Sequence, residues 1–235
     1  MGFYRGPNIT RKDLLWHVDA GSPRSYGGSG TTWSDLTINN HDFVEEGSPT
    51  WDKQGFQMDG TSDWFETPDV ENDENSYTVE AFFKFHTTNS KYGGIICRWQ
   101  TGANTNNEFF LGSANGSTAP GYPRFGVDNT AGSDYTAAGS TLMTTDVWYH
   151  QVGTFDGTTV RVYLNGEEKD NIAFSGTANT YRTQPMAIGA FGDGMESGSL
   201  VYEAPIKVRY ARMYNRVLTP SEILQNYNAQ KNRTV

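Results

Sequence analysis

The 235-residue sequence contains a single cysteine, Cys97, and an unequal balance of charge. One cysteine excludes a framework of intrachain disulfides. The 27 acidic residues outnumber the 18 basic ones, which gives a formal net charge of −9 at pH 7. Nucleic-acid binding needs clustered lysine and arginine to displace counterions, so the composition argues against a nucleic-acid partner.

Long apolar runs and leader-like segments are lacking as well. No stretch approaches the roughly 18 apolar residues of a membrane-spanning helix, so we expect no insertion into a membrane. The segment Met1 to Thr10 has no apolar core behind a basic region, which predicts that there is no signal peptide. We therefore expect the chain to be made and folded in a cytoplasm.

Aromatic residues and turn formers, in contrast, are plentiful. Phe, Tyr and Trp make up 14% of the chain, which also has 26 glycines and 9 prolines. This profile is typical of a β-sandwich rather than of a helical bundle or a disordered chain. Short segments with strand character are separated by clusters of small polar residues. The predicted strands are Leu14–Val18, Gly55–Met58, Trp64–Glu66, Tyr77–Phe85, Gly94–Trp99, Glu108–Gly112, Arg124–Asp128, Trp148–Phe155, Val160–Leu164, Met186–Gly189 and Ile206–Tyr214.

The segment Tyr77–Phe85 shows the clearest alternation along the chain. Glu80 and Lys84 fall on one face, and the opposite face consists of Tyr77, Val79, Ala81, Phe83 and Phe85. Further along, Asp156-Gly157 and Asn165-Gly166 supply the turn chemistry that tight hairpins need. These signals predict a single antiparallel sandwich of about a dozen strands.

One helix is predicted, near the C-terminus. Thr219 provides an N-cap, Pro220 suits the first helical position and Glu222 completes a capping box. An apolar stripe then follows at helical spacing, made of Ile223, Leu224 and Tyr227. The predicted fold class is therefore all-β with one short C-terminal helix.

Several motifs in this order resemble the laminin-G-like, concanavalin A-like jelly-roll superfamily. They are Gly55–Gly60 (GFQMDG), Tyr77–Phe85 (YTVEAFFKF), Asp146–Val152 (DVWYHQV), Val162–Gly166 (VYLNG) and Met213–Thr219 (MYNRVLT). The resemblance extends over about Leu14 to Ala229 and implies a two-sheet antiparallel jelly roll. We expect residues 13–235 to form one such domain, with residues 1–12 as a lead segment that serves as a docking arm.

The N-terminal part resembles, more narrowly, a subgroup found in virion and tail proteins of tailed phages. The residues that carry this likeness are Leu14–Gly21 (LLWHVDAG), Tyr26 and Gly28–Leu36 (GSGTTWSDL). The resemblance implies a non-enzymatic structural or adhesion protein of a phage virion: a decoration, collar or tail-fibre-associated protein. Its partners would then be other virion proteins and a host surface glycan. Phage fibres and decorations are often homo-oligomers, which makes a homo-oligomer an expectation here too.

Catalysis is the less favoured alternative. Glycosidases need two positioned carboxyl groups, and jelly-roll glucanases present them along one strand as Glu-x-Asp-x-Glu. The run Glu71–Glu74 partly imitates that spacing but lies in a polar stretch without strand alternation. Within Tyr77–Phe85, Glu80 has no acidic partner at two-residue spacing. We therefore predict that the chain is not an enzyme.

Other reactive residue types are arranged without catalytic or zinc-binding spacing. The four histidines, His17, His41, His86 and His150, are scattered along the chain. His150 follows Trp148 within a predicted strand and is expected to be packed or at an edge. Cys97 is predicted to be a small buried hydrophobic residue rather than a nucleophile.

Calcium is the one cofactor that the resemblance suggests, although none is required. Pentraxins, a related branch, hold calcium with an Asp-Asn pair after one strand and acidic residues after a later strand. By motif, Asn106 and Asn107 occupy the place of that pair and Asp193 the place of a later ligand. The sequence departs from the pattern at Asn106, which replaces the charged member, and at Phe191, where another carboxyl ligand would stand.

A lectin-type module for host attachment is the main alternative to a purely structural role. Sugars pack their apolar faces on aromatic rings, while amide and carboxylate groups bind their hydroxyls. The candidate glycan contacts are Trp33, Trp99, Asn104, Asn106, Tyr122, Tyr135 and Tyr181, with Trp51 and Trp64 as further loop-proximal tryptophans.

Overall fold

A computed structural model describes residues 8–67, 70–72, 75–89, 92–99, 107–115, 118–180, 185–190 and 202–232. Within these ranges the chain forms two eight-stranded sheets and one helix, α2. The first sheet contains β1 (Leu14–Asp19), β4 (Thr50–Asp52), β5 (Gly55–Gln57), β7 (Tyr77–Phe85), β12 (Tyr149–Phe155), β13 (Thr159–Leu164), β14 (Glu167–Ala173) and β16 (Ile206–Tyr214). The second contains β2 (Thr32–Trp33), β3 (Phe43–Glu46), β6 (Trp64–Thr67), β8 (Gly93–Arg98), β9 (Phe109–Asn115), β10 (Thr118–Asp128), β11 (Asp134–Ala138) and β15 (Met186–Ile188).

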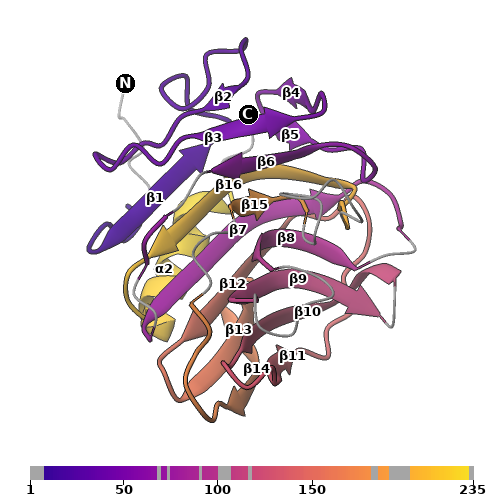
Figure 1. Cartoon of the computed structure of the whole chain (residues 1–235). Helices are drawn as coiled ribbons and strands as arrows, with labels where there is room; N and C mark the ends of the chain where they lie inside the picture. The colour runs from indigo at the N-terminus through magenta and orange to yellow at the C-terminus, as the bar shows by residue number, and fades with distance from the viewer. Residues whose placement is uncertain are drawn as a thin grey trace.

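Neighbouring strands in both sheets run antiparallel. The first sheet has the order β14-β13-β12-β7-β16-β5-β4, with β1 also paired to β16, and the second has the order β11-β10-β9-β8-β15-β6-β3-β2. The sheets lie face to face as two layers (Figure 1), and β10 of the second sheet contacts β12 and β13 of the first. This arrangement confirms the predicted all-β jelly-roll sandwich.

Every strand predicted from the sequence overlaps an observed strand, and both predicted hairpin turns are present. Asn165 and Gly166 both have positive φ, at 54° and 85°, where β13 turns into β14. Such a pair matches the twist of a two-residue hairpin. The space between the sheets is filled by one apolar core that includes Trp16, Phe43 and Phe83, all fully buried.

The helix α2 (Pro220–Gln230) lies against the outer face of the first sheet (Figure 1). Its start has the predicted capping box, in which Thr219 and Glu222 exchange side-chain-to-backbone hydrogen bonds. Ile223 packs with Val152 and Tyr214 in a second apolar cluster beneath the helix. In the part of the chain that the structure describes, no helix is long and apolar enough to cross a membrane.

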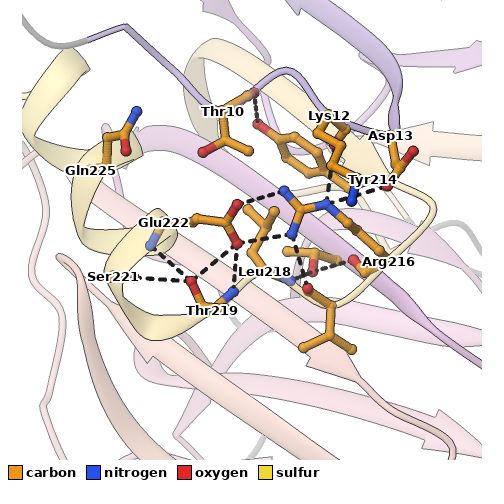
Figure 2. A network of polar contacts seen from close by, with 12 residues as sticks. Thr10, Lys12, Asp13, Tyr214, Arg216, Leu218, Thr219, Ser221, Glu222 and Gln225 are labelled. Carbon is orange, nitrogen blue, oxygen red and sulfur yellow. Dashed lines mark hydrogen bonds and ion pairs between the residues drawn. The ribbon is translucent and has the colours of Figure 1, made fainter.

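The helix and the end of β16 hold the segment that precedes β1. Figure 2 shows Arg216 between the Glu222 carboxylate and the carbonyl oxygen of Lys12, to which its Nε donates at 3.2 Å. The Tyr214 hydroxyl donates to the carbonyl of Thr10, and Gln225 donates to that of Asn8. The described part of the expected docking arm, residues 8–12, is therefore bound to the body of the sandwich, and residues 1–7 lie outside the described ranges.

Candidate functional site

The strands β9 and β10 alternate side chains between the core and the outer face of the second sheet. Phe109, Leu111, Phe125 and Val127 point into the core and are fully buried. Their neighbours in sequence therefore lie on the outer face, because side chains alternate along a strand. These neighbours are Phe110, Gly112, Arg124, Gly126 and Asp128.

A hollow of about 180 Å³ lies on this outer face. It is lined by Tyr92, Trp99, Phe110, Arg124, Asp134 and Thr136. These residues come from β9, β10 and β11 and from the two ends of β8. Cross-strand pairing brings them together: Phe110 lies opposite Gly126, and Gly126 lies opposite Thr136.

Aromatic side chains form one wall of the hollow. The rings of Trp99 and Phe110 meet edge to face, with centroids 6.2 Å apart and planes inclined by 67°. Phe110 packs with the buried Cys97, and Tyr92 and Trp99 pack against this pair. Such rings present apolar surface next to polar groups.

Two glycines make room for side chains that line the hollow. A Cβ atom at Gly126 would stand 2.7 Å from Oγ1 of Thr136 and 3.2 Å from Oδ1 of Asp134. At Gly112 a Cβ atom would come within 2.1 Å of the Phe110 ring. Both positions therefore depend on a missing side chain: the Phe110 ring lies over Gly112, and the side chains of Thr136 and Asp134 lie over Gly126.

Gln151 supports the strands beneath the hollow, β9 and β10, from inside the sandwich. Its side chain is fully buried on β12 of the first sheet. Its amide donates to the carbonyl oxygens of Gly112 at 2.8 Å and of Arg124 at 3.0 Å. Because Gly112 and Arg124 are cross-strand partners, this single side chain fixes the point where β9 and β10 meet below the hollow.

The polar wall carries opposite charges at its two ends. Arg124 pairs with Ala138, and Asp134 lies four residues earlier on β11. Thr136, between them, donates to Oδ1 of Asp134 at 2.7 Å. Burial raises the pKa of Asp134, while the Thr136 hydrogen bond and the positive charge of Arg124 oppose that rise. Nε of Arg124 is buried and has no hydrogen-bond partner among the described residues.

Asp128 stands beside the hollow, directly opposite Asp134 across β10 and β11. It is 2% exposed, and Asn107 donates its side-chain amide to Oδ2 at 2.9 Å. Burial raises the pKa of Asp128 to about 6; the Asn107 hydrogen bond opposes that rise and the charge of Asp134 adds to it.

The structure separates the predicted glycan contacts. Trp99 lines the hollow. The prediction for Trp33 is wrong, because its side chain is fully buried between Phe56 and Phe65 and cannot face a ligand. Outside the hollow, Tyr122 is half-buried on β10, and Tyr135 packs against Phe174 with ring centroids 4.7 Å apart. Asn104, Asn106 and Tyr181 lie outside the described residues.

Calcium binding stays a prediction. Asn106 and Asp193 lie outside the described residues, and Asn107 directs its amide N–H to Asp128. Among the described residues, no group of three or more His, Cys, Asp or Glu side chains could hold a metal ion. Calcium takes about six to eight oxygen ligands, so Asn107 and Asp128 alone do not make a calcium site.

The structure also shows where the residues considered for catalysis lie. Glu80 is fully buried, where Arg212 and His150 bind its carboxylate, so it cannot reach a substrate. His150 is packed, as predicted, and Cys97 is buried, which raises the pKa of its thiol. The side chain of Glu71 is exposed, between the buried Val70 and Asn72, and Glu74 is outside the described residues.

Comparison with known protein families identifies a matching family model. The model of the laminin G-like family Laminin_G_3, described as the concanavalin A-like lectin/glucanases superfamily, matches residues 59–224. None of the curated proteins compared with the chain matches it.

Solved structures share the fold at low sequence identity. Domain 4 of AbnA, a GH43 extracellular arabinanase from Geobacillus stearothermophilus solved with arabinotriose, is 16% identical with a TM-score of 0.67, covering 92% of this chain and 98% of that domain. The receptor binding domain of botulinum neurotoxin C/D mosaic serotype is 13% identical with a TM-score of 0.67. The match covers 95% of this chain and 53% of the toxin domain. Trypanosoma rangeli sialidase in complex with sialic acid is 15% identical with a TM-score of 0.67. The match covers 95% of this chain and 34% of the sialidase.

The chain spans about half of the toxin domain and a third of the sialidase. These likenesses show the fold alone. The family model, in contrast, matches well over half of the sequence. This chain therefore belongs to the concanavalin A-like lectin/glucanases superfamily.

Proposed function

We propose that the chain is a non-enzymatic glycan-binding module and that the hollow on the second sheet is its sugar site. One observation carries this proposal: the rings of Trp99 and Phe110 and the polar side chains of Arg124, Asp134 and Thr136 line the same hollow. A sugar ring needs both kinds of wall, because its C–H face is apolar and its rim carries hydroxyl groups.

The size of the hollow favours a short stretch of glycan. Pockets that enclose a drug-sized ligand usually measure about 300–1,000 Å³. The hollow measures about 180 Å³, which suits one sugar unit with its neighbours in solvent. The arabinanase domain with the same fold was solved with a bound trisaccharide, which supports a sugar as the ligand class.

Binding to a glycan array, followed by calorimetry on the best ligand, tests the proposal. Trp99→Ala should weaken binding about 10-fold or more, since it removes the larger ring of the apolar wall. Trp64→Ala is the matched control, because Trp64 is also a half-buried tryptophan of the second sheet but does not line the hollow. Equal effects of the two variants, or no glycan binding by the parent protein, would contradict the proposal.

The absence of catalysis is part of the proposal and has its own test. Of the two carboxylates nearest the hollow, Asp134 lines it, while Asp128 is 2% exposed and bound by Asn107. A buried second carboxyl group is poorly placed to attack a glycosidic bond or activate water. Incubation of the protein with any glycan that it binds should release no reducing sugar. Release that disappears in Asp134→Asn would instead identify an enzyme.

We further propose that the module is displayed on a phage virion, in contact with other virion proteins. Support comes from the N-terminal residues that resemble phage tail proteins, among them Trp16, Asp19 and Asp35. A cryo-EM map of purified particles would locate the domain, its neighbours and its copy number. Failure to find the chain in particles by mass spectrometry would end this part of the proposal and leave the glycan site untouched.

A further inference from the structure

The hollow is polarised along the strands. Arg124 and Ala138 are cross-strand partners, and Asp134 lies four positions from Ala138 on β11. Four strand residues correspond to about 13 Å. The cationic and anionic side chains therefore come from opposite ends of the hollow, and Thr136 lies between them along β11.

The positive end has unused donor capacity. A guanidinium group carries five N–H donors. Nε of Arg124 is buried without a hydrogen-bond partner in the described part of the chain, and no ion pair within 4 Å joins Arg124 to a described carboxylate. The guanidinium lines the hollow without a carboxylate partner among the described residues, so an anionic group of a ligand can pair with it.

The negative end has the opposite requirement. Oδ1 of Asp134 accepts a hydrogen bond from Thr136, and the residue is exposed to solvent. An ionised carboxylate only accepts hydrogen bonds. This end therefore selects hydroxyl groups on the ligand and repels a second anionic group.

We infer that the sugar held in the hollow carries a single carboxylate, bound by the Arg124 guanidinium, while its hydroxyl groups donate to Asp134 and its ring packs on Trp99 and Phe110. This inference rests on the proposed function and names the class of sugar. Arginine binds a carboxylate through two parallel hydrogen bonds, which gives both strength and orientation. The net charge of the chain, −9, repels an approaching anion from a distance. Salt screens this long-range repulsion, so it does not prevent a carboxylate from binding Arg124 at close range.

Paired sugars that differ in the acidic unit provide the test. Calorimetry would compare 3′-sialyllactose with lactose, and a galacturonic acid oligomer with the corresponding galactose oligomer. At least one acidic member should bind about 10-fold tighter than its neutral partner. Arg124→Gln should abolish this preference, whereas Arg124→Lys, which keeps the charge without the planar fork, should retain part of it.

Arg161→Gln serves as the matched control, because Arg161 lies on β13 of the other sheet and pairs with Asp156. This variant should leave the affinities for the acidic and the neutral sugar unchanged. Thermal melts should show that Arg124→Gln, Arg124→Lys and Arg161→Gln are all folded. Equal binding of acidic and neutral sugars, or an acidic preference that survives Arg124→Gln, overturns the inference while the glycan site stands. Failure of every sugar to bind overturns the inference together with the proposed function.

Discussion

Arg212 and Glu80 form an ion pair that solvent does not reach. Nη1 of Arg212 donates to Oε1 of Glu80 at 2.6 Å, and both side chains are fully buried between the first sheet and α2. His150 and Asn226 also contact the Glu80 carboxylate, at 3.1 and 3.2 Å. A charged group therefore joins β7, β12, β16 and the helix.

Removing one partner of this pair should be strongly destabilising. In Arg212→Met the Glu80 charge stays buried without its main partner, which typically costs about 3–5 kcal/mol of unfolding free energy. Urea unfolding followed by tryptophan fluorescence measures this loss. Arg161→Met, which breaks the partly exposed pair with Asp156, should cost less than about 1 kcal/mol. Similar losses in the two variants would contradict the importance of burial.

The same pair predicts how stability responds to acid. Burial alone would raise the pKa of Glu80, but the Arg212 charge and the His150 hydrogen bond outweigh it and lower the pKa to about 2. A lowered folded-state pKa gives stability that is present above the unfolded value of 4.5 and is lost as pH falls toward 2.

Glu80→Gln removes this titration while keeping an acceptor. The difference in melting temperature between the parent protein and Glu80→Gln should be largest above pH 5 and shrink steadily toward pH 2.5. Melting curves at half-unit pH intervals would show the trend. A difference that stays constant across this range would mean that Glu80 contributes packing rather than charge.

Strand positions were predictable because the sequence alternates strongly where one face is buried. The predicted Tyr77–Phe85 coincides with β7 to the residue. β14 was missed because its residues, Glu167–Ala173, are mostly polar or exposed and carry no period-2 apolar signal. β2 and β4 were missed because two or three residues are too short to show a period.

The site was less predictable, because it depends on which strands become neighbours. Phe110 and Gly126 are 16 positions apart in sequence and become opposite one another only through the β9–β10 register. Trp33 shows the converse. Its loop-like sequence context suggested a surface ring, but pairing of β2 with β3 turns it into the core. Alternation in Arg124–Asp128, with charged residues and a glycine on one face, was the signal that could have indicated the hollow.

Asp35, in the N-terminal motif Gly28–Leu36, holds a loop in place. Asp35 accepts hydrogen bonds from the backbone N–H groups of His17, Thr37 and His41, which fixes the loop that covers the free edge of β1. Covering an edge strand prevents pairing with other chains. Asp35 therefore has a structural role within the sandwich and is a poor candidate for a ligand contact.

A side chain at Gly126, beneath Thr136 and Asp134, should weaken binding without unfolding the protein. In Gly126→Ala the new methyl group would stand 2.7 Å from Oγ1 of Thr136 and displace the side chains that face the ligand. We expect glycan affinity to fall about 10-fold or more, with a melting temperature within a few degrees of the parent. Gly27→Ala is the matched control, since a Cβ atom there meets nothing within 4 Å. Unchanged glycan binding by Gly126→Ala would place the site elsewhere.

Asp128 should respond to pH in the sense opposite to Glu80. Its folded-state pKa, about 6, lies above the ordinary value of 3.8. Its contribution to the free energy of unfolding is therefore full below pH 3.8 and is lost as the pH rises through 6. Asn at this position mimics the protonated form and can still accept from Asn107. Asp128→Asn should therefore match the parent protein at pH 4 and melt a few degrees higher at pH 7.5. A variant that is less stable than the parent at pH 7.5 would show instead that the ionised carboxylate is stabilised by its surroundings.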